Sequence, residues 1–279
     1  MSALTPLTCS VHTHSLWCDG QNTLEEMARA AWEQGVRHFG ASGHSHTPVP
    51  SDEGNVLPRD PAGYCQEVLR LRRVYEGRME VLLGIEQDSC AEAPVPDWAD
   101  YWIGSVHHLP DPRRPGRYYA VDWNLDSLRA GCENLGGRDF LALAERYYAG
   151  VAAMARRRPT ILGHIDLIVK LNRGGALFDE NASRYRSAAL EALSSADPRE
   201  TLLEINTGAM ARGYRDVPYP AQFLLRDWRD RGGRVILTAD AHTAAGILHA
   251  YGEAADWART AGFTRASVLT RAGEAECPL

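Results

Sequence analysis

The stretch Cys9-Ser10-Val11-His12-Thr13-His14-Ser15-Leu16-Trp17-Cys18-Asp19-Gly20 decides how the rest of the chain is interpreted. It begins as a short extended run and ends in turn residues, Asp19-Gly20. Residues two apart on a strand point to the same face, so we expect His12 and His14 to project together. With Asp19 nearby, they could form part of a metal site. A lone His-x-His is more often two unrelated histidines, so the remaining sequence has to decide.

The composition is that of an ordinary globular protein. The 279 residues are 44% hydrophobic and 24% charged, which is ample for a sizeable core. A net charge of −6 gives no basic excess of the kind a general nucleic-acid-binding surface needs, although it does not exclude a local basic pocket. We therefore expect no nucleic-acid partner, and oligomer formation is left open.

The cellular location is predicted from the cysteines and the apolar segments. Met1–Leu7 lacks the charged start and apolar run of a signal peptide, and no apolar stretch reaches the roughly 20 residues of a membrane helix. The six cysteines are scattered and form no Cys-x-x-Cys pair, which favours reduced thiols. We expect a cytoplasmic protein without a membrane partner.

Short apolar runs alternate with helical patterns about seven times, which predicts an α/β fold with a parallel sheet. Both an open doubly wound sheet and a closed barrel satisfy this alternation. The lack of a glycine-rich loop after the first run counts against the dinucleotide-binding open sheet. The expected strands are 8–14, 36–42, 81–86, 101–108, 160–164, 201–206 and 234–242, with a final short strand at 265–270. The expected helices are 24–34, 64–76, 125–132, 140–157, 180–195, 220–231 and 244–260; 47–61 and 110–121 are expected to be loops.

Histidines and acids recur where these runs end. In a parallel barrel all such ends lie on one face, which builds the active site. Buried polar groups need partners, and imidazoles beside carboxylates are partnered best by metal ions. Six strand ends carry them: His12 and His14, His44, Glu86, His107, His164, and Asp240 with His242.

At this point the chain resembles the polymerase-and-histidinol-phosphatase (PHP) superfamily of metal-dependent phosphoesterases. The ordered set of motifs is specific and covers nearly the whole chain. Within the superfamily it looks most like the histidinol phosphatases. The motifs are His12-Thr13-His14 with Asp19, Gly43-His44, Gly84-Ile85-Glu86, Gly104-Ser105-Val106-His107, Gly163-His164-Ile165-Asp166, Glu204-Ile205-Asn206-Thr207 and Asp240-Ala241-His242.

The resemblance implies one distorted (β/α)7 TIM-like barrel spanning residues 1–279, with three divalent metal ions at the C-terminal ends of the strands. Zinc, manganese and iron all suit such ligands. One departure is Gly43, where relatives often carry an acid. By resemblance, the first ion is held by His12, His14, Glu86 and Asp240, the second by His107 and His164 with Glu86 bridging, and the third by Asp19, His44 and His242.

The chemistry implied is hydrolysis of a phosphate monoester, with L-histidinol phosphate the leading substrate and histidine biosynthesis the corresponding pathway. Adjacent metal ions neutralise phosphoryl oxygens and lower the pKa of a bridging water, so no Ser or Cys nucleophile is needed. We assign catalytic roles to Glu86, Asp240 and His242. The alternatives are a phosphodiesterase or exonuclease of the same superfamily acting on nucleotides, and a non-catalytic metal-binding module.

Three residues are predicted to contact the substrate: Arg212, His108 and Lys170. Arg212 matches a family arginine and could fork onto a phosphate oxygen. His108 and His46 lie beside ligands and could equally be solvated loop histidines. Arg117 is a weaker candidate, and Asp166 either supports His164 or caps a turn.

Overall fold

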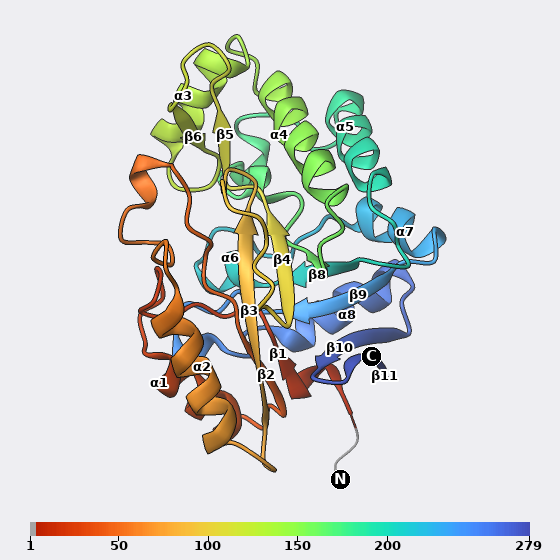
Figure 1. The fold of residues 1–279 in the computed structure, drawn as a ribbon. Coiled ribbons are helices and arrows are strands. Elements are labelled where there is room, and N and C mark those ends of the chain that lie inside the picture. Colours follow the sequence, from red (N-terminus) through yellow and green to blue (C-terminus); the bar gives the residue numbers. More distant parts are fainter. Residues whose placement is uncertain (1–3) are drawn as a thin grey trace.

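The computed structural model describes residues 4–279, and a curled sheet of parallel strands forms its centre (Figure 1). Each of these strands is hydrogen-bonded to the next in parallel, and their residues are almost all buried. Strands buried on both faces are typical of sheets covered by helices. In spatial order they are β1 (Cys9–Ser10), β2 (His38–Ala41), β3 (Glu80–Asp88), β4 (Tyr101–Ser105), β7 (Ile161–Leu162), β8 (Leu202–Asn206) and β9 (Arg234–Thr238).

One isolated bridge closes this sheet into a barrel. Thr13, beyond β1, pairs in parallel with Ala241, beyond β9. The His14 N–H donates to the Ala241 carbonyl at 2.8 Å, and the Ala241 N–H donates to the His12 carbonyl at 3.0 Å. The predicted distorted (β/α)7 barrel is confirmed.

Two further strands extend the barrel wall at its other end. β10 (Arg265–Thr270), predicted from the sequence, pairs in parallel with β9 through Ser267 and Ile236. β11 (Gly273–Pro278), which was not predicted, pairs antiparallel with β10 along its whole length. The barrel is therefore closed by one bridge at the end that carries the histidines and by added strands at the opposite end.

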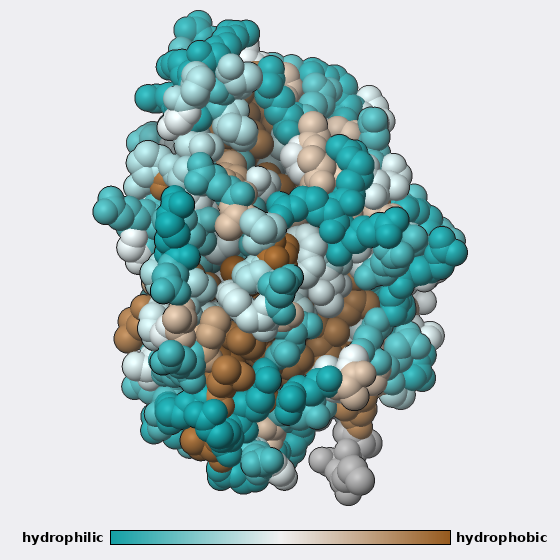
Figure 2. Space-filling view, in the orientation of Figure 1, coloured by the Kyte–Doolittle hydropathy of each residue, from teal (hydrophilic) through white to brown (hydrophobic). Residues whose placement is uncertain are grey.

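Helices cover the outside of the sheet, and their outer faces are mostly hydrophilic in Figure 2, with apolar side chains gathered between them. The Thr23 hydroxyl accepts from the Glu26 N–H at 3.2 Å, which confirms the capping box of the first helix. No helix within residues 4–279 is long and apolar enough to span a bilayer. The helices are α1 (Leu24–Glu33), α2 (Ala62–Val74), α3 (Leu125–Leu135), α4 (Phe140–Ala155), α5 (Ser183–Ser194), α6 (Gly208–Ala211), α7 (Gln222–Asp230) and α8 (Tyr251–Ala261).

Tyr101 explains why β1 ends earlier than the expected 8–14 strand. Its hydroxyl donates to the Val11 carbonyl at 2.5 Å and lies 3.3 Å from that of Ala41. The ring fits because Gly40 and Gly84 have no side chain, since a Cβ at either position would lie 2.3 Å from a Tyr101 atom. The tyrosine thus replaces ladder bonds between β1 and β2.

Three other sequence-based boundaries were wrong. The expected loop 110–121 overlaps an antiparallel hairpin, β5 (His108–Pro110) with β6 (Tyr118–Ala120), whose strands are too short to show an alternating pattern. Pro220 precedes α7 because the chain is still paired with β8 at Tyr219. The expected helix 244–260 is divided by Ala250, which has a left-handed backbone (φ 54°).

Candidate metal centre

The bridge that closes the barrel also positions four of the predicted ligands. Side chains alternate in direction along extended chain, so the residues that flank Thr13 share one face. His12 and His14 are fully buried, and Asp240 and His242 flank Ala241 in the same way. Asp240 has a left-handed backbone (φ 48°), and its carboxylate Oδ1 lies 3.2 Å from His14 Nε2 and 3.6 Å from His12 Nε2. Two chain segments more than 220 residues apart therefore meet as one cluster.

Glu86 lies at the centre of this cluster and is fully buried. Its two oxygens face different histidines. Oε1 lies towards His107 and His164, and Oε2 lies towards His12, His14 and His44. Such a carboxylate is suited to bridge two ions. Five imidazole nitrogens lie 3.0–3.4 Å from its oxygens, those of His12, His14, His44, His107 and His164.

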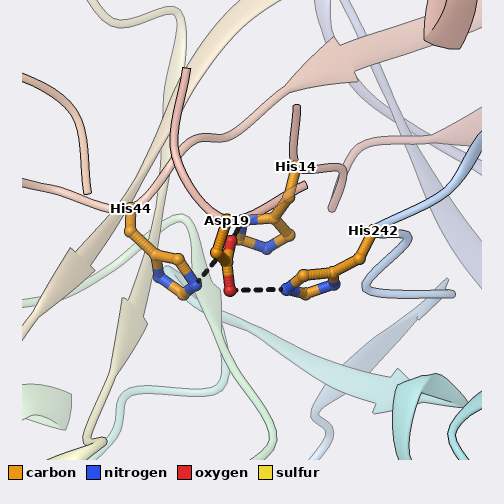
Figure 3. A group of neighbouring side chains, drawn as sticks. All are labelled: His14, Asp19, His44 and His242. Carbon is orange, nitrogen blue, oxygen red and sulfur yellow. Dashed lines mark hydrogen bonds and ion pairs between the residues drawn. The ribbon is translucent and has the colours of Figure 1, made fainter. Parts of the chain in front are cut away.

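A second group surrounds Asp19, as Figure 3 shows. The Asp19 carboxylate lies 3.0 Å from His242 Nε2, 3.5 Å from His14 Nδ1 and 3.6 Å from His44 Nε2. The structure thus brings together every residue of the three predicted ligand sets. The sets overlap, because His14 contacts the Asp19 group as well as the Glu86 group.

The donor set fits divalent metal ions. Within residues 4–279, four buried atoms of the predicted ligands have no hydrogen-bond partner, and three of them face one another across the cluster: His12 Nε2, His14 Nε2 and Glu86 Oε2. The same three residues offer ligand atoms within 4.8 Å of one another. Buried polar atoms without a partner are costly, and nitrogen and carboxylate ligands at such spacing suit zinc and its neighbours.

The cluster also perturbs the acid–base behaviour of its members. Burial alone would raise the pKa of Glu86, but the imidazoles of His44, His12 and His107 outweigh it and bring the pKa well below its usual range. Burial and the neighbouring His242 and His44 lower the pKa of His14 to about 3. Burial alone would lower the pKa of His107, but Glu86 and Asp88 outweigh it and raise the pKa to about 9. Shifts of this size are typical of functional sites.

Comparison with known proteins supports this interpretation. Residues 10–208 match the PHP domain family. The chain belongs to the PHP domain family. The histidinol-phosphatase of Bacillus subtilis is 24% identical over 263 residues, which cover 86% of this chain and 95% of that protein.

Solved structures show the same fold for this PHP domain. A chain from Listeria monocytogenes superimposes with a TM-score of 0.72 at 16% identity, covering 87% of this chain and 98% of the other. The histidinol phosphate phosphatase of Lactococcus lactis, crystallised with zinc, L-histidinol and phosphate, superimposes with a TM-score of 0.65 at 18% identity, covering 95% and 98%.

Glu204 is a member of the site that sequence reasoning missed in this role. It is fully buried and belongs to none of the three predicted ligand sets, yet its Oε1 lies 2.5 Å from His12 Nδ1. The same oxygen accepts from the Thr238 hydroxyl at 2.7 Å. Its Oε2 accepts from the His164 N–H at 2.7 Å and from Asn206 Nδ2 at 3.0 Å. The carboxylate thereby links the two histidines.

Every partner of Glu204 is a donor, which fixes the tautomer of His12. The Asn206 amide is oriented by its oxygen, which accepts from the Gly208 N–H at 2.8 Å, so its nitrogen faces Glu204. An ionised carboxylate satisfies four donors, and His12 must carry a proton on Nδ1 to be one of them. Its Nε2 is then directed at Glu86, with a lone pair available whenever the ring is neutral.

Asp88 supports His107 in the same manner and was also missed. Its Oδ2 lies 3.0 Å from both the backbone nitrogen and Nδ1 of His107, which leaves Nε2 facing Glu86. Asp88 is two residues after Glu86 on β3. That spacing was the available sequence signal, because residues two apart on a strand share a face.

A cleft of about 400 Å³ opens onto the cluster, and all three predicted substrate-contacting residues line it. Arg212 donates to Asp240 Oδ2 at 2.9 Å. His108 Nε2 lies 3.4 Å from Asp52 Oδ1. Lys170 donates to Asp122 Oδ2 at 2.8 Å, so its charge is already paired.

The weaker candidates lie elsewhere. Arg117 is exposed on the β5–β6 hairpin, where it donates to the Tyr119 hydroxyl at 3.1 Å. His46 is half-buried and does not line the cleft. Asp166 accepts from the Ala221 N–H at 2.8 Å, at the start of α7, which favours the capping role. A Cβ at Gly43 would lie 3.0 Å from Leu57, so this chain has little room there for any side chain.

Proposed function

We propose that this protein is a metal-dependent phosphomonoesterase that hydrolyses L-histidinol phosphate to L-histidinol and phosphate. The observation that carries the proposal is the convergence of buried, unpartnered ligand atoms of His12, His14 and Glu86 on one point. The substrate is proposed from relatives, since the Bacillus subtilis protein is named histidinol-phosphatase. The Lactococcus lactis protein was crystallised with L-histidinol, phosphate and zinc.

The proposal includes three divalent ions, with zinc favoured over manganese and iron. The first would be held by His12, His14, Glu86 and Asp240. When bound, such ions supply positive charge for phosphoryl oxygens and a water of lowered pKa. The second would be held by His107 and His164 with Glu86, and the third by Asp19, His44 and His242.

The other residues act on the substrate directly. Arg212 would donate from its guanidinium to a phosphoryl oxygen while staying paired with Asp240. His108 and Lys170 would contact the ester from the cleft wall. Glu86, Asp240 and His242 are the residues we propose as catalytic. Residues 1–279 would form a single cytoplasmic domain in the histidine biosynthetic pathway.

The test is phosphate release by protein of measured metal content. The substrates are L-histidinol phosphate, sugar phosphates, nucleoside monophosphates and a short oligonucleotide. We expect close to three ions per chain, the highest kcat/KM on L-histidinol phosphate, and loss of activity in His14→Ala but not in the exposed His249→Ala control. Full activity after complete chelation, or preferential cleavage of the oligonucleotide, would overturn the proposal.

A further inference from the structure

The loop between β2 and α2 forms one wall of the cleft and carries an acid that the proposed chemistry does not use. A single 3-10 turn, Pro50–Asp52, places Asp52 at the cleft together with Thr47 and Val56. The loop is tied to the barrel where the Leu57 N–H donates to the His44 carbonyl at 2.8 Å. The loop that carries Asp52 is therefore hydrogen-bonded to His44, one of the predicted ligands.

The other acids that line the cleft have assigned partners. Asp19 belongs to the metal centre, Asp88 accepts from His107, and Asp122 pairs with the Lys170 ammonium. Asp52 belongs to neither network: its Oδ1 lies 3.4 Å from His108 Nε2, within residues 4–279 no lysine or arginine lies within 4.0 Å of its carboxylate, and only 15% of its side chain is exposed. The carboxylate in this cleft that neither pairs with a lysine or arginine nor contacts a predicted metal ligand is that of Asp52.

Two contacts with protein groups hold Asp52 in place. The Thr47 hydroxyl donates to Oδ2 at 2.6 Å, which fixes the carboxylate and leaves Oδ1 towards His108 at 3.4 Å. The ring of His108 is itself incompletely partnered, because its buried Nδ1 has no hydrogen bond. A buried nitrogen without a partner and a partly exposed carboxylate oxygen thus lie together in the cleft, where a ligand could use both.

We propose that Asp52 is a specificity-determining residue that binds a protonated amine on the alcohol half of the substrate. The inference rests on the proposed function for the position of the phosphate, which Arg212 and the metal centre would hold. Asp52 lies beside His108 in the same cleft that the predicted ligands His44 and His107 line. A half-buried carboxylate binds a cation more strongly than a neutral donor. The ligand class is therefore phosphate monoesters of amino alcohols.

The preformed carboxylate makes this selection efficient. Because Thr47 already orients Asp52, little side-chain freedom is lost when the amine binds. A phosphate ester without a cationic group would leave Asp52 buried by the ligand and unpaired, which disfavours it. The predicted preference thus has an attractive and a repulsive part.

The decisive experiment removes the amine and the carboxylate separately. We would measure kcat/KM for L-histidinol phosphate and for its desamino analogue, 3-(imidazol-4-yl)propyl phosphate, with the wild-type metal-loaded protein and with Asp52→Asn. We expect the wild type to prefer the amine by about 10- to 100-fold, and Asp52→Asn to lose most of that preference. Thr47→Val, which frees the carboxylate, should lose part of it. Glu53→Gln, exposed on the same loop, is the matched control and should keep it.

The outcomes separate this inference from the proposed function. If the wild type cleaves L-histidinol phosphate and Asp52→Asn keeps the full preference for the amine, the inference is wrong and the proposed function stands. If the wild type cleaves neither ester, the same ratio is measured with O-phosphoethanolamine and ethyl phosphate. A preference for the amine that depends on Asp52 then supports the inference without the histidinol substrate, and its absence overturns it.

Discussion

Glu86 and Glu204 are both fully buried carboxylates on barrel strands, yet they have opposite surroundings. All partners of Glu204 are hydrogen-bond donors, so the protein alone satisfies it. Glu86 is surrounded by imidazoles, and its Oε2 has no hydrogen bond. Glu204 is therefore a carboxylate that positions ligands, whereas Glu86 is suited to be a ligand itself. Burial alone would not distinguish the two.

Glu86→Gln should give the largest effect, because an amide cannot bridge two ions with two anionic oxygens. We expect phosphate release to fall by at least about 10³-fold, the order of loss when a main electrostatic group is removed. Metal binding to the native state stabilises it, so the rise in Tm on adding zinc to chelated protein should also disappear.

The control for this variant is Glu80→Gln, at the other end of the same strand, where the side chain is 41% exposed. It should keep both activity and the zinc-dependent rise in Tm. Wild-type metal content in Glu86→Gln would contradict the assignment of Glu86 as a ligand.

Glu204→Gln should give a smaller but different effect. Each oxygen of Glu204 accepts from two donors, so the NH2 of an amide would face two of the four donors, and at least one buried hydrogen bond is lost whichever way the amide is turned. We expect metal affinity to fall about 10- to 100-fold through His12. Stability should fall by about 1–3 kcal/mol, and this loss should persist in chelated protein.

Urea unfolding with and without chelator measures this second difference, and the exposed Glu200→Gln is the control. If Glu204→Gln were as stable as the wild type after chelation, the hydrogen-bond network would not have the structural role that we assign to it.

The sequence allowed one member of this pair to be assigned and not the other. Glu86 ends an apolar run, and the ends of parallel strands meet on one face, so its place among the histidines was predictable, and the family resemblance implied that it bridges two ions. Glu204 also lies on a predicted strand, but its role depends on His12 and Thr238, which are brought to it by strand order and register. Neither contact can be inferred from the sequence, because both depend on the closed barrel.

The same limit applies to the fold. The alternation of strands and helices predicted an α/β fold with a parallel sheet, because each apolar run suits a strand buried on both faces, and the family resemblance implied the barrel. The early end of β1 was not predictable, since it depends on Tyr101 entering the space left by Gly40 and Gly84 from two other strands. The hairpin β5–β6 was missed because three-residue strands carry too little pattern.

Arg212→Lys tests the ion pair between Arg212 and Asp240, another carboxylate of the cluster. A lysine keeps the charge but cannot contact Asp240 and a phosphoryl oxygen with two nitrogens of a fixed fork. We expect KM for the phosphate ester to rise by about tenfold with a smaller change in kcat. Arg215→Lys is the control, because Arg215 pairs with Glu180 away from the cleft. Equal effects of the two substitutions on KM would exclude a direct role for Arg212 in binding phosphate.

Asp166 adds a third kind of buried carboxylate to the comparison, and it should give the smallest effect. Burial raises the pKa of Asp166 to about 6, because one N–H of Ala221 and the charge of Arg215 only partly compensate. Among the described residues, its Oδ1 has no hydrogen-bond partner. Burial of this incompletely satisfied acid favours its protonated form.

The sign of the pH effect follows from this raised pKa. The folded state holds the proton more tightly than the unfolded state, so the contribution of Asp166 to stability is present at low pH and is lost as pH rises towards and past 6. Asn cannot ionise but can still accept from Ala221. The free energy of unfolding of the wild type, relative to Asp166→Asn, should therefore fall by about 1 kcal/mol between pH 5 and pH 7. Urea titrations of both chelated proteins at the two pH values measure this difference, and a constant difference would mean that Asp166 is ionised throughout, as Glu204 is.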